Sequence, residues 1–215
     1  MPLSGGPAPS PAIFDFQLGS YYPPFSDDDE SAHRDDIELI FEAGLTAGCG
    51  GDEYCPLAPV SRWEMAVFLT GVWDRLGLEF PDYSEAPFDD LGDLSPFARE
   101  SIGRLVQLGL SSGTSPTTFD PLGEVSRGQM ALFLSALWRQ AGFYALPGGA
   151  AGDRFIDIQE MPEHVQLAIG QIAALGITSG TSPTSYDPFA NVTREQMATF
   201  LARSLQGLGW SLEAP

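Results

Sequence analysis

Three arginines stand where their charge is expected to be unfavourable. Each directly follows a Ser or Thr that is typical of a helix N-cap, so each occupies a first helical position. A cation there opposes the helix dipole at a cost of about 0.3–1 kcal/mol. Free N–H groups of a helix N-terminus and a guanidinium could instead bind an anion together. The sequence therefore predicts anion-binding roles, with an ion pair to an acid of a neighbouring repeat as the alternative, for Arg62, Arg127 and Arg194.

The arginines belong to a box, Val-(Ser/Thr)-Arg-x-(Glu/Gln)-Met-Ala, that occurs three times. The intervals between the arginines are 65 and 67 residues, which is typical of a tandem array of one supersecondary unit. The rest of the box fits helix capping, because a Ser or Thr is followed three residues later by Glu or Gln. The predicted capping pairs are Ser61 with Glu64, Ser126 with Gln129 and Thr193 with Gln196.

Each repeat has the same order of parts around its box. An aromatic-acid opening precedes a helix with apolar residues at 3.6 spacing, which a Gly ends. A loop then leads to the box and a longer apolar helix. The openings are Phe25-Ser26-Asp27, Phe88-Asp89-Asp90 and Phe155-Ile156-Asp157, and the glycines are Gly44, Gly109 and Gly176. These patterns predict an all-α fold of three helix–loop–helix repeats whose box helices share a core.

The repeats set the predicted domain boundaries. We expect repeats at 25–80, 81–146 and 147–208, preceded by an N-terminal arm at 1–24 and followed by a tail at 209–215. The arm is rich in Pro, Gly and Ser, which favours a mobile tail. Its alternating apolar residues leave open a second interpretation, an extended arm that docks on a neighbouring subunit.

The charge of the chain excludes some classes of partner. The 215 residues carry a formal charge of −19, and all ten basic residues are Arg. Such a surface repels nucleic acid and anionic lipid, and no basic stripe offsets it. No apolar run has the 18 residues of a membrane span, and no secretory leader is recognisable at the N-terminus. We therefore expect neither a nucleic-acid partner nor membrane insertion.

The two cysteines, Cys49 and Cys55, lie in a Gly-rich loop of the first repeat. Two cysteines without a neighbouring His are too few for a structural zinc site, and their spacing is not that of a redox Cys-x-x-Cys motif. A loop-closing disulfide, worth about 2–3 kcal/mol, is the favoured interpretation, and it would indicate an oxidising compartment. Two free thiols are the alternative. No metal or cofactor is predicted.

Together the openings, the glycine-bounded loops and the Arg boxes resemble the S-layer homology family, over residues 25–208. The resemblance implies a pseudo-threefold body with the box helices in a central three-helix bundle and grooves between repeats. It also implies that the grooves bind cell-wall polysaccharide, through arginines that correspond to Arg62, Arg127 and Arg194. Trp63 offers a stacking face for a sugar, whereas Glu195 places a negative charge beside Arg194, so the groove at Arg62 is the favoured one.

Two functions follow from these observations. The first is a non-catalytic module that attaches a structure to a cell-wall glycan at the cell surface. The second is a structural subunit of an extracellular assembly, such as a virion surface protein or a filament component, in which the arm links copies. We predict no enzymatic activity, because the sequence has no nucleophile motif of the Gly-x-Ser-x-Gly type, no phosphate-binding glycines and no His pair for a metal.

Overall fold

A computed structural model describes residues 24–143 and 147–210. These residues form six α-helices and two short 3₁₀-helices, without a strand, so the predicted all-α class is confirmed. The predicted arm at 1–24, except its last residue, and most of the predicted tail lie outside the described residues. The elements are α1 (Arg34–Glu42), α2 (Arg62–Arg75), α3 (Pro96–Gln107), α4 (Arg127–Gln140), η1 (Gly149–Gly152), η2 (Ile156–Ile158), α5 (Glu163–Ala174) and α6 (Arg194–Gly207).

Local sequence accounts for the start of α3 and for the ends of the three outer helices. In α3, the Ser95 hydroxyl accepts the Ala98 N–H, and Pro96 takes the first helical position, where a missing N–H costs nothing. Two residues after the last residue of α1, α3 and α5, the chain turns at a glycine with a left-handed backbone conformation. These residues are Gly44, Gly109 and Gly176, with φ of 68°, 67° and 74°.

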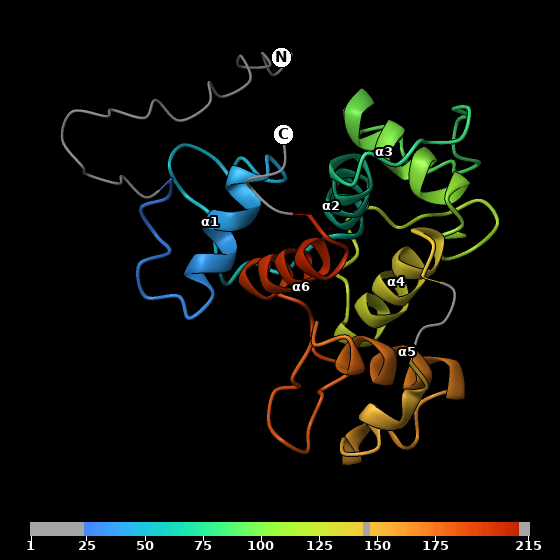
Figure 1. Ribbon diagram of the computed structural model, residues 1–215. Helices are drawn as coiled ribbons and strands as arrows, with labels where there is room; N and C mark the ends of the chain where they lie inside the picture. Colours follow the sequence, from blue (N-terminus) through green and yellow to red (C-terminus); the bar gives the residue numbers. More distant parts are fainter. Residues whose placement is uncertain (1–23, 144–146, 211–215) are drawn as a thin grey trace.

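The box helices α2, α4 and α6 lie at the centre, and α1, α3 and α5 lie outside them (Figure 1). The closely packed helix pairs join different repeats: α3 packs on α2, α5 packs on α4, and α1 packs on α6. The first helix of each repeat thus covers the box helix of the repeat before it, and the first repeat covers the third. These three α-helix pairs thus join all the repeats, and the buried apolar side chains form one core.

Three valines close the array into a ring of backbone hydrogen bonds. The N–H of Val60 donates to the carbonyl of Val192 (2.9 Å), that of Val192 to Val125 (2.9 Å), and that of Val125 back to Val60 (3.0 Å). All three side chains are fully buried. This cyclic exchange between equivalent positions supports the pseudo-threefold arrangement and the repeat boundaries, which both stay predictions.

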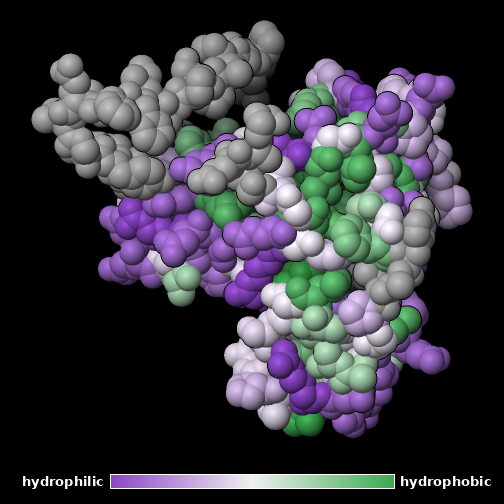
Figure 2. All heavy atoms as spheres, in the orientation of Figure 1, coloured by the Kyte–Doolittle hydropathy of each residue, from purple (hydrophilic) through white to green (hydrophobic). Residues whose placement is uncertain are grey.

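The surface is uneven in polarity. In Figure 2, apolar side chains gather over the central helices, whereas the part of the molecule around α1 is hydrophilic. The segment that leads into α1 contains the acidic run Asp27-Asp28-Asp29-Glu30. Asp28 is buried in the core, whereas the other three residues of this run are exposed.

Asp28 occupies a core position that is apolar in the other repeats. It follows the opening Phe-x-Asp directly, as do Leu91 and Ile158, which are both buried. Its side chain has no exposed surface, and neither carboxylate oxygen has a hydrogen-bond partner among the described residues. Burial raises the pKa of the Asp28 carboxyl, because the charged form loses its hydration.

Substituting Asp28→Leu should therefore stabilise the protein at pH 7 by about 1–3 kcal/mol, because it removes an unpaired buried polar group. Because the pKa of Asp28 is raised in the folded state, folding favours the protonated carboxyl. The protein therefore loses stability as the pH rises through that pKa and the carboxyl becomes charged. The gain should thus be larger at pH 7 than at pH 4 in urea unfolding. Glu30→Leu, at an exposed acid, is the control and should change stability little. A loss of stability in Asp28→Leu at pH 7 would contradict this account.

Candidate functional site

Each box arginine is inserted into the loop of another repeat. The three residues are only 4–6% exposed. In each case the Nε–H donates to a backbone carbonyl at 2.7–2.8 Å, and the guanidinium carbon lies 4.7–4.9 Å from the centre of the aromatic ring of the same residue. The pairs are Arg62 with Phe119, Arg127 with Tyr186 and Arg194 with Tyr54. The contacts therefore run from the first repeat to the second, then to the third, and back to the first.

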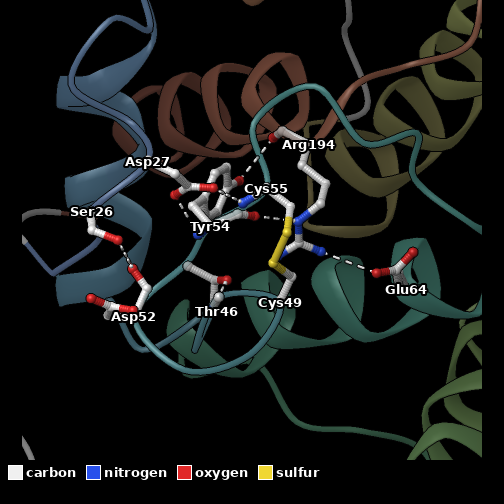
Figure 3. The surroundings of a disulfide bond; sticks show 10 residues. Ser26, Asp27, Thr46, Cys49, Asp52, Tyr54, Cys55, Glu64 and Arg194 are labelled. Atoms are coloured by element: carbon white, nitrogen blue, oxygen red, sulfur yellow. Dashed lines mark hydrogen bonds and ion pairs between the residues drawn. A yellow bond between two sulfur atoms is a disulfide. The ribbon is translucent and has the colours of Figure 1, made fainter.

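The opening Asp of each repeat fixes the loop that receives the arginine. The Asp27 carboxylate accepts the N–H of Tyr54 (2.7 Å) and of Cys55 (2.8 Å), as Figure 3 shows. Asp90 and Asp157 hold the other two loops in the same way. The sequence-based alternative was an ion pair between each arginine and an acid of a neighbouring repeat, such as the opening Asp. The opening Asp does not fill this role, because its carboxylate binds the loop N–H groups. Among the described residues, Arg194 alone of the three has such an ion pair, with Glu64.

The N-terminal N–H groups of the box helices are not free to bind an anion. In α2, the N–H of Arg62 donates to the carbonyl of Gly123 (2.9 Å) and that of Trp63 to Pro121 (3.0 Å). The first two N–H groups of α4 and of α6 are satisfied in the same way by loop carbonyls. The expectation of open helix N-termini is therefore wrong, and only the outer nitrogens of the guanidinium groups remain for a ligand.

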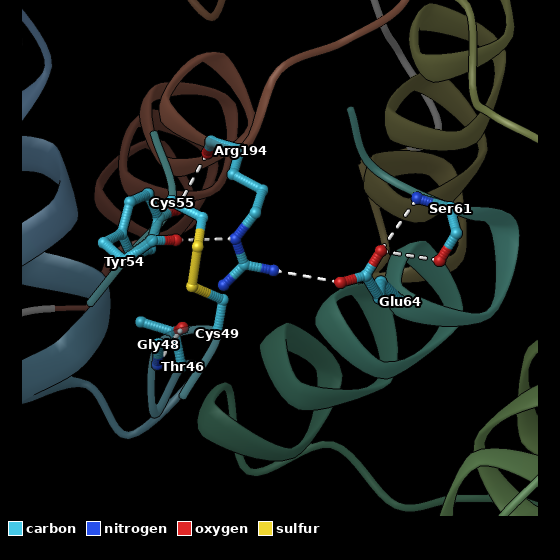
Figure 4. Close-up of polar contacts among 8 residues, drawn as sticks. All are labelled: Thr46, Gly48, Cys49, Tyr54, Cys55, Ser61, Glu64 and Arg194. Atoms are coloured by element: carbon cyan, nitrogen blue, oxygen red, sulfur yellow. Dashed lines mark hydrogen bonds and ion pairs between the residues drawn. A yellow bond between two sulfur atoms is a disulfide. The ribbon is translucent and has the colours of Figure 1, made fainter. Parts of the chain in front are cut away.

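Those outer nitrogens have different partners at the three junctions. Arg194 Nη1 forms an ion pair with Glu64 Oε1 at 3.0 Å, and Glu64 lies between this arginine and Ser61 (Figure 4). Arg127 Nη1 donates to Gln196 Oε1 at 3.2 Å. No described residue accepts a hydrogen bond from the Nη atoms of Arg62. Burial lowers the pKa of Arg62, and the nearby Asp120 and Asp90 act in the opposite direction.

The three predicted capping pairs differ in the same way. Glu64 Oε2 accepts both the N–H and the hydroxyl of Ser61, while its Oε1 binds Arg194. Ser126 and Gln129 form the reciprocal capping box. Thr193 accepts the Gln196 N–H at 3.4 Å, but the Gln196 side chain does not return to it. That side chain faces Arg127 instead, so the third box is capped from one side.

A cleft of about 470 Å³ opens at the Arg62 junction, between α4, α5 and the loop at 110–113. It draws residues from all three repeats and has no acidic residue in its lining, although the chain carries 29 acids. Trp63, which was expected to offer a stacking face, is half-buried against the core and does not line this cleft. The polar lining residues are Arg62, Ser111, Ser112, Gln129, Ser135, Arg139, His164 and Gln171.

Arg139 adds a second positive charge to the lining of this cleft. It stands twelve residues after the box arginine of α4, where α2 has Asp74 and α6 has Gln206. It makes no ion pair with the described residues. Sequence reasoning missed Arg139 and His164 as site residues. Comparing the three box helices position by position would have revealed the change of sign at Arg139.

A family model matches two of the repeats, and two known proteins align with larger parts of the chain. Residues 87–131 and 154–198 match the S-layer homology domain. The chain is 31% identical over 178 residues to the surface-layer 125 kDa protein of Lysinibacillus sphaericus, which covers 81% of this chain and 14% of that protein. It is 27% identical over 121 residues to an endoglucanase of Bacillus sp. (strain KSM-635), which covers 55% of this chain and 13% of that protein.

The chain therefore spans about one seventh of the length of these relatives. The first repeat lies outside the two matched segments. Within the described ranges, no helix is both long and apolar enough to cross a bilayer.

The arginine contact predicts a large effect of a substitution that keeps the charge. Arg127→Lys removes the Nε–H bond to the Tyr186 carbonyl and the planar contact with its ring. We expect a loss of about 2–4 kcal/mol in the free energy of unfolding, measured with urea. The matched control is Arg99→Lys on the exposed face of α3, which should be nearly neutral. Equal stability of the two variants would show that the buried contact is not stabilising.

Cys49 and Cys55 form a disulfide, with their Cα atoms 6.0 Å apart. Cys55 has φ of 59°, and the equivalent residues, Asp120 and Asp187, share this left-handed conformation, which Asp tolerates better than most side chains. Replacing both cysteines by serine should cost about 2 kcal/mol in thermal unfolding. Combining Cys49→Ser with Cys55→Asp should cost less, because it restores the residue of the other two loops. The same loss in both double variants would refute the equivalence of these positions.

Proposed function

We propose that the chain is a non-catalytic module that attaches to the bacterial cell wall by binding an acidic wall polysaccharide in the cleft beside Arg62. The observation that carries the proposal is that this cleft is positively charged, whereas the chain as a whole is strongly negative. In a chain with a formal charge of −19, the cleft presents Arg62 and Arg139 and no acid. An acidic sugar would be repelled by most of the surface and attracted to this one region.

The lining of the cleft suits a sugar that carries a carboxylate or phosphate. The Nη atoms of Arg62 would contact the anionic group from inside, where the low polarity of the surroundings strengthens a charged hydrogen bond. Arg139 would approach it from the exposed rim. Gln129, Gln171 and the serines supply donors and acceptors for sugar hydroxyls, and the apolar faces of sugar rings would pack on Leu132 and Leu167.

The comparisons support this proposal. Two repeats match the S-layer homology domain, and one relative is a surface-layer protein. We propose that residues 25–80 form a third copy, because Arg62 and Tyr54 make the same contacts as their counterparts in the matched repeats. The location follows as the outside of a cell. The proposal does not extend to the activity of the endoglucanase, because the match covers 13% of that protein.

The alternative function, a subunit of a virion or filament, depends on the arm at 1–24. Residues 1–23 lie outside the described part of the chain. Docking of the arm on further copies of the chain therefore stays a prediction.

Binding to wall material should depend on Arg139. In co-sedimentation with purified cell-wall sacculi of Lysinibacillus sphaericus, Arg139→Gln should bind roughly tenfold more weakly than wild type, because one charged hydrogen bond is lost. Arg139 is suited to the test because it is exposed, whereas substituting Arg62 would also break the contact with Phe119.

The control is Arg99→Gln, which changes the net charge equally but lies outside the cleft. Sacculi extracted with hydrofluoric acid, which removes phosphodiester-linked polymers, should no longer bind wild type. Equal retention of Arg139→Gln and Arg99→Gln would overturn the proposed site.

A further inference from the structure

A second hollow, of about 680 Å³, lies on the other side of the N-terminus of α5. Its walls are η1, the segment through η2, and the first turns of α5. The wall formed by η1 is held close to α5, since a Cβ on Gly170 would lie 2.0 Å from the Gly149 carbonyl oxygen. Only glycine permits this approach, so the hollow is bounded by backbone that is fixed in place.

The two hollows adjoin along α5. His164 and Leu167, one turn apart on α5, line both of them. Together the hollows follow α5 from Glu163 to Gln171, which is about 12 Å along the helix axis. Each volume alone lies within the range of roughly 300–1,000 Å³ for small-molecule sites. The two adjoining hollows, together called the channel below, offer more room than a single sugar requires.

The ends of this channel carry opposite charges. The Arg62 cleft is lined by two arginines and no acid, whereas the second hollow is lined by Asp153 and Glu163 and by no arginine. Both acids are exposed and make no ion pair among the described residues. Phe155, Ile158 and Leu167 also line the second hollow, and Leu167 is the exposed one of the three.

We propose that this channel binds an internal stretch of a glycan several sugars long, with an anionic group beside Arg62 and Arg139 and a free amino group beside Asp153 and Glu163. This inference rests on the proposed function and specifies its ligand. An ammonium group would donate hydrogen bonds to the two carboxylates, whereas an N-acetylated amine is neutral and bulkier. The ring faces of the intervening sugars would lie over His164 and Leu167. The ligand class is thus a polymer that carries both acidic sugars and non-acetylated amino sugars.

A defined pair of probes tests the amino-group requirement. Hexasaccharides from hyaluronan alternate glucuronate with N-acetylglucosamine, and chemical N-deacetylation gives the same chain with free amines. Isothermal titration should show that wild type binds the deacetylated hexasaccharide about three- to fivefold more tightly, the size expected of exposed ion pairs. Asp153→Asn combined with Glu163→Gln should remove this preference, so that the two hexasaccharides bind equally.

Two controls separate the outcomes. Glu30→Gln combined with Glu160→Gln changes the net charge equally at exposed acids outside the channel, and should keep the preference. Arg139→Gln should weaken both hexasaccharides alike. A preference that survives in the Asp153–Glu163 variant, equal binding of the two probes by wild type, or no binding of either would overturn the inference. The proposed function is tested separately, by the retention of Arg139→Gln on sacculi.

Discussion

The structure depends on one interaction that is repeated three times: a buried guanidinium that donates to a backbone carbonyl of another repeat and lies over its aromatic ring. Burying an arginine is costly unless its charge is hydrogen-bonded. The carbonyl, the ring face and the aspartate that orders the loop supply that compensation. Because the donor and the acceptor always belong to different repeats, the interaction couples the whole array, in agreement with the ring of bonds between Val60, Val125 and Val192.

This contact uses the Nε–H and the face of each guanidinium. The outer Nη nitrogens therefore remain available for other partners. Arg194 is neutralised by Glu64, and Arg127 is satisfied by Gln196. Arg62 has neither partner, and its junction holds the cleft with Arg139. At two junctions one outer nitrogen of the arginine thus has an acceptor, and at the third neither has one among the described residues. The Arg62 and Arg127 junctions both have a Gln at the equivalent position, and they differ in its contacts: Gln196 accepts from Arg127, whereas Gln129 caps Ser126.

Much of the local structure could be predicted from the sequence. Helix starts at Ser61 and Ser126 and helix ends at Gly44 and Gly109 follow from short-range chemistry, which short motifs specify. The partners of the arginines could not be predicted. Arg62 and Phe119 lie 57 residues apart. Every residue has a backbone carbonyl, so the residue types do not show which carbonyl accepts the hydrogen bond. The burial of Asp28 could not be predicted either, because charge in a run does not show which residue faces inward.

The central claim can be tested directly by nitrogen-15 NMR of the arginine side chains, which reports hydrogen exchange at each Nε–H. Of the ten arginines, Arg62, Arg127 and Arg194 should have strongly protected Nε–H groups, with through-hydrogen-bond coupling to the carbonyl carbons of Phe119, Tyr186 and Tyr54. Exchange at these three positions as fast as at the exposed Arg99 would contradict the account.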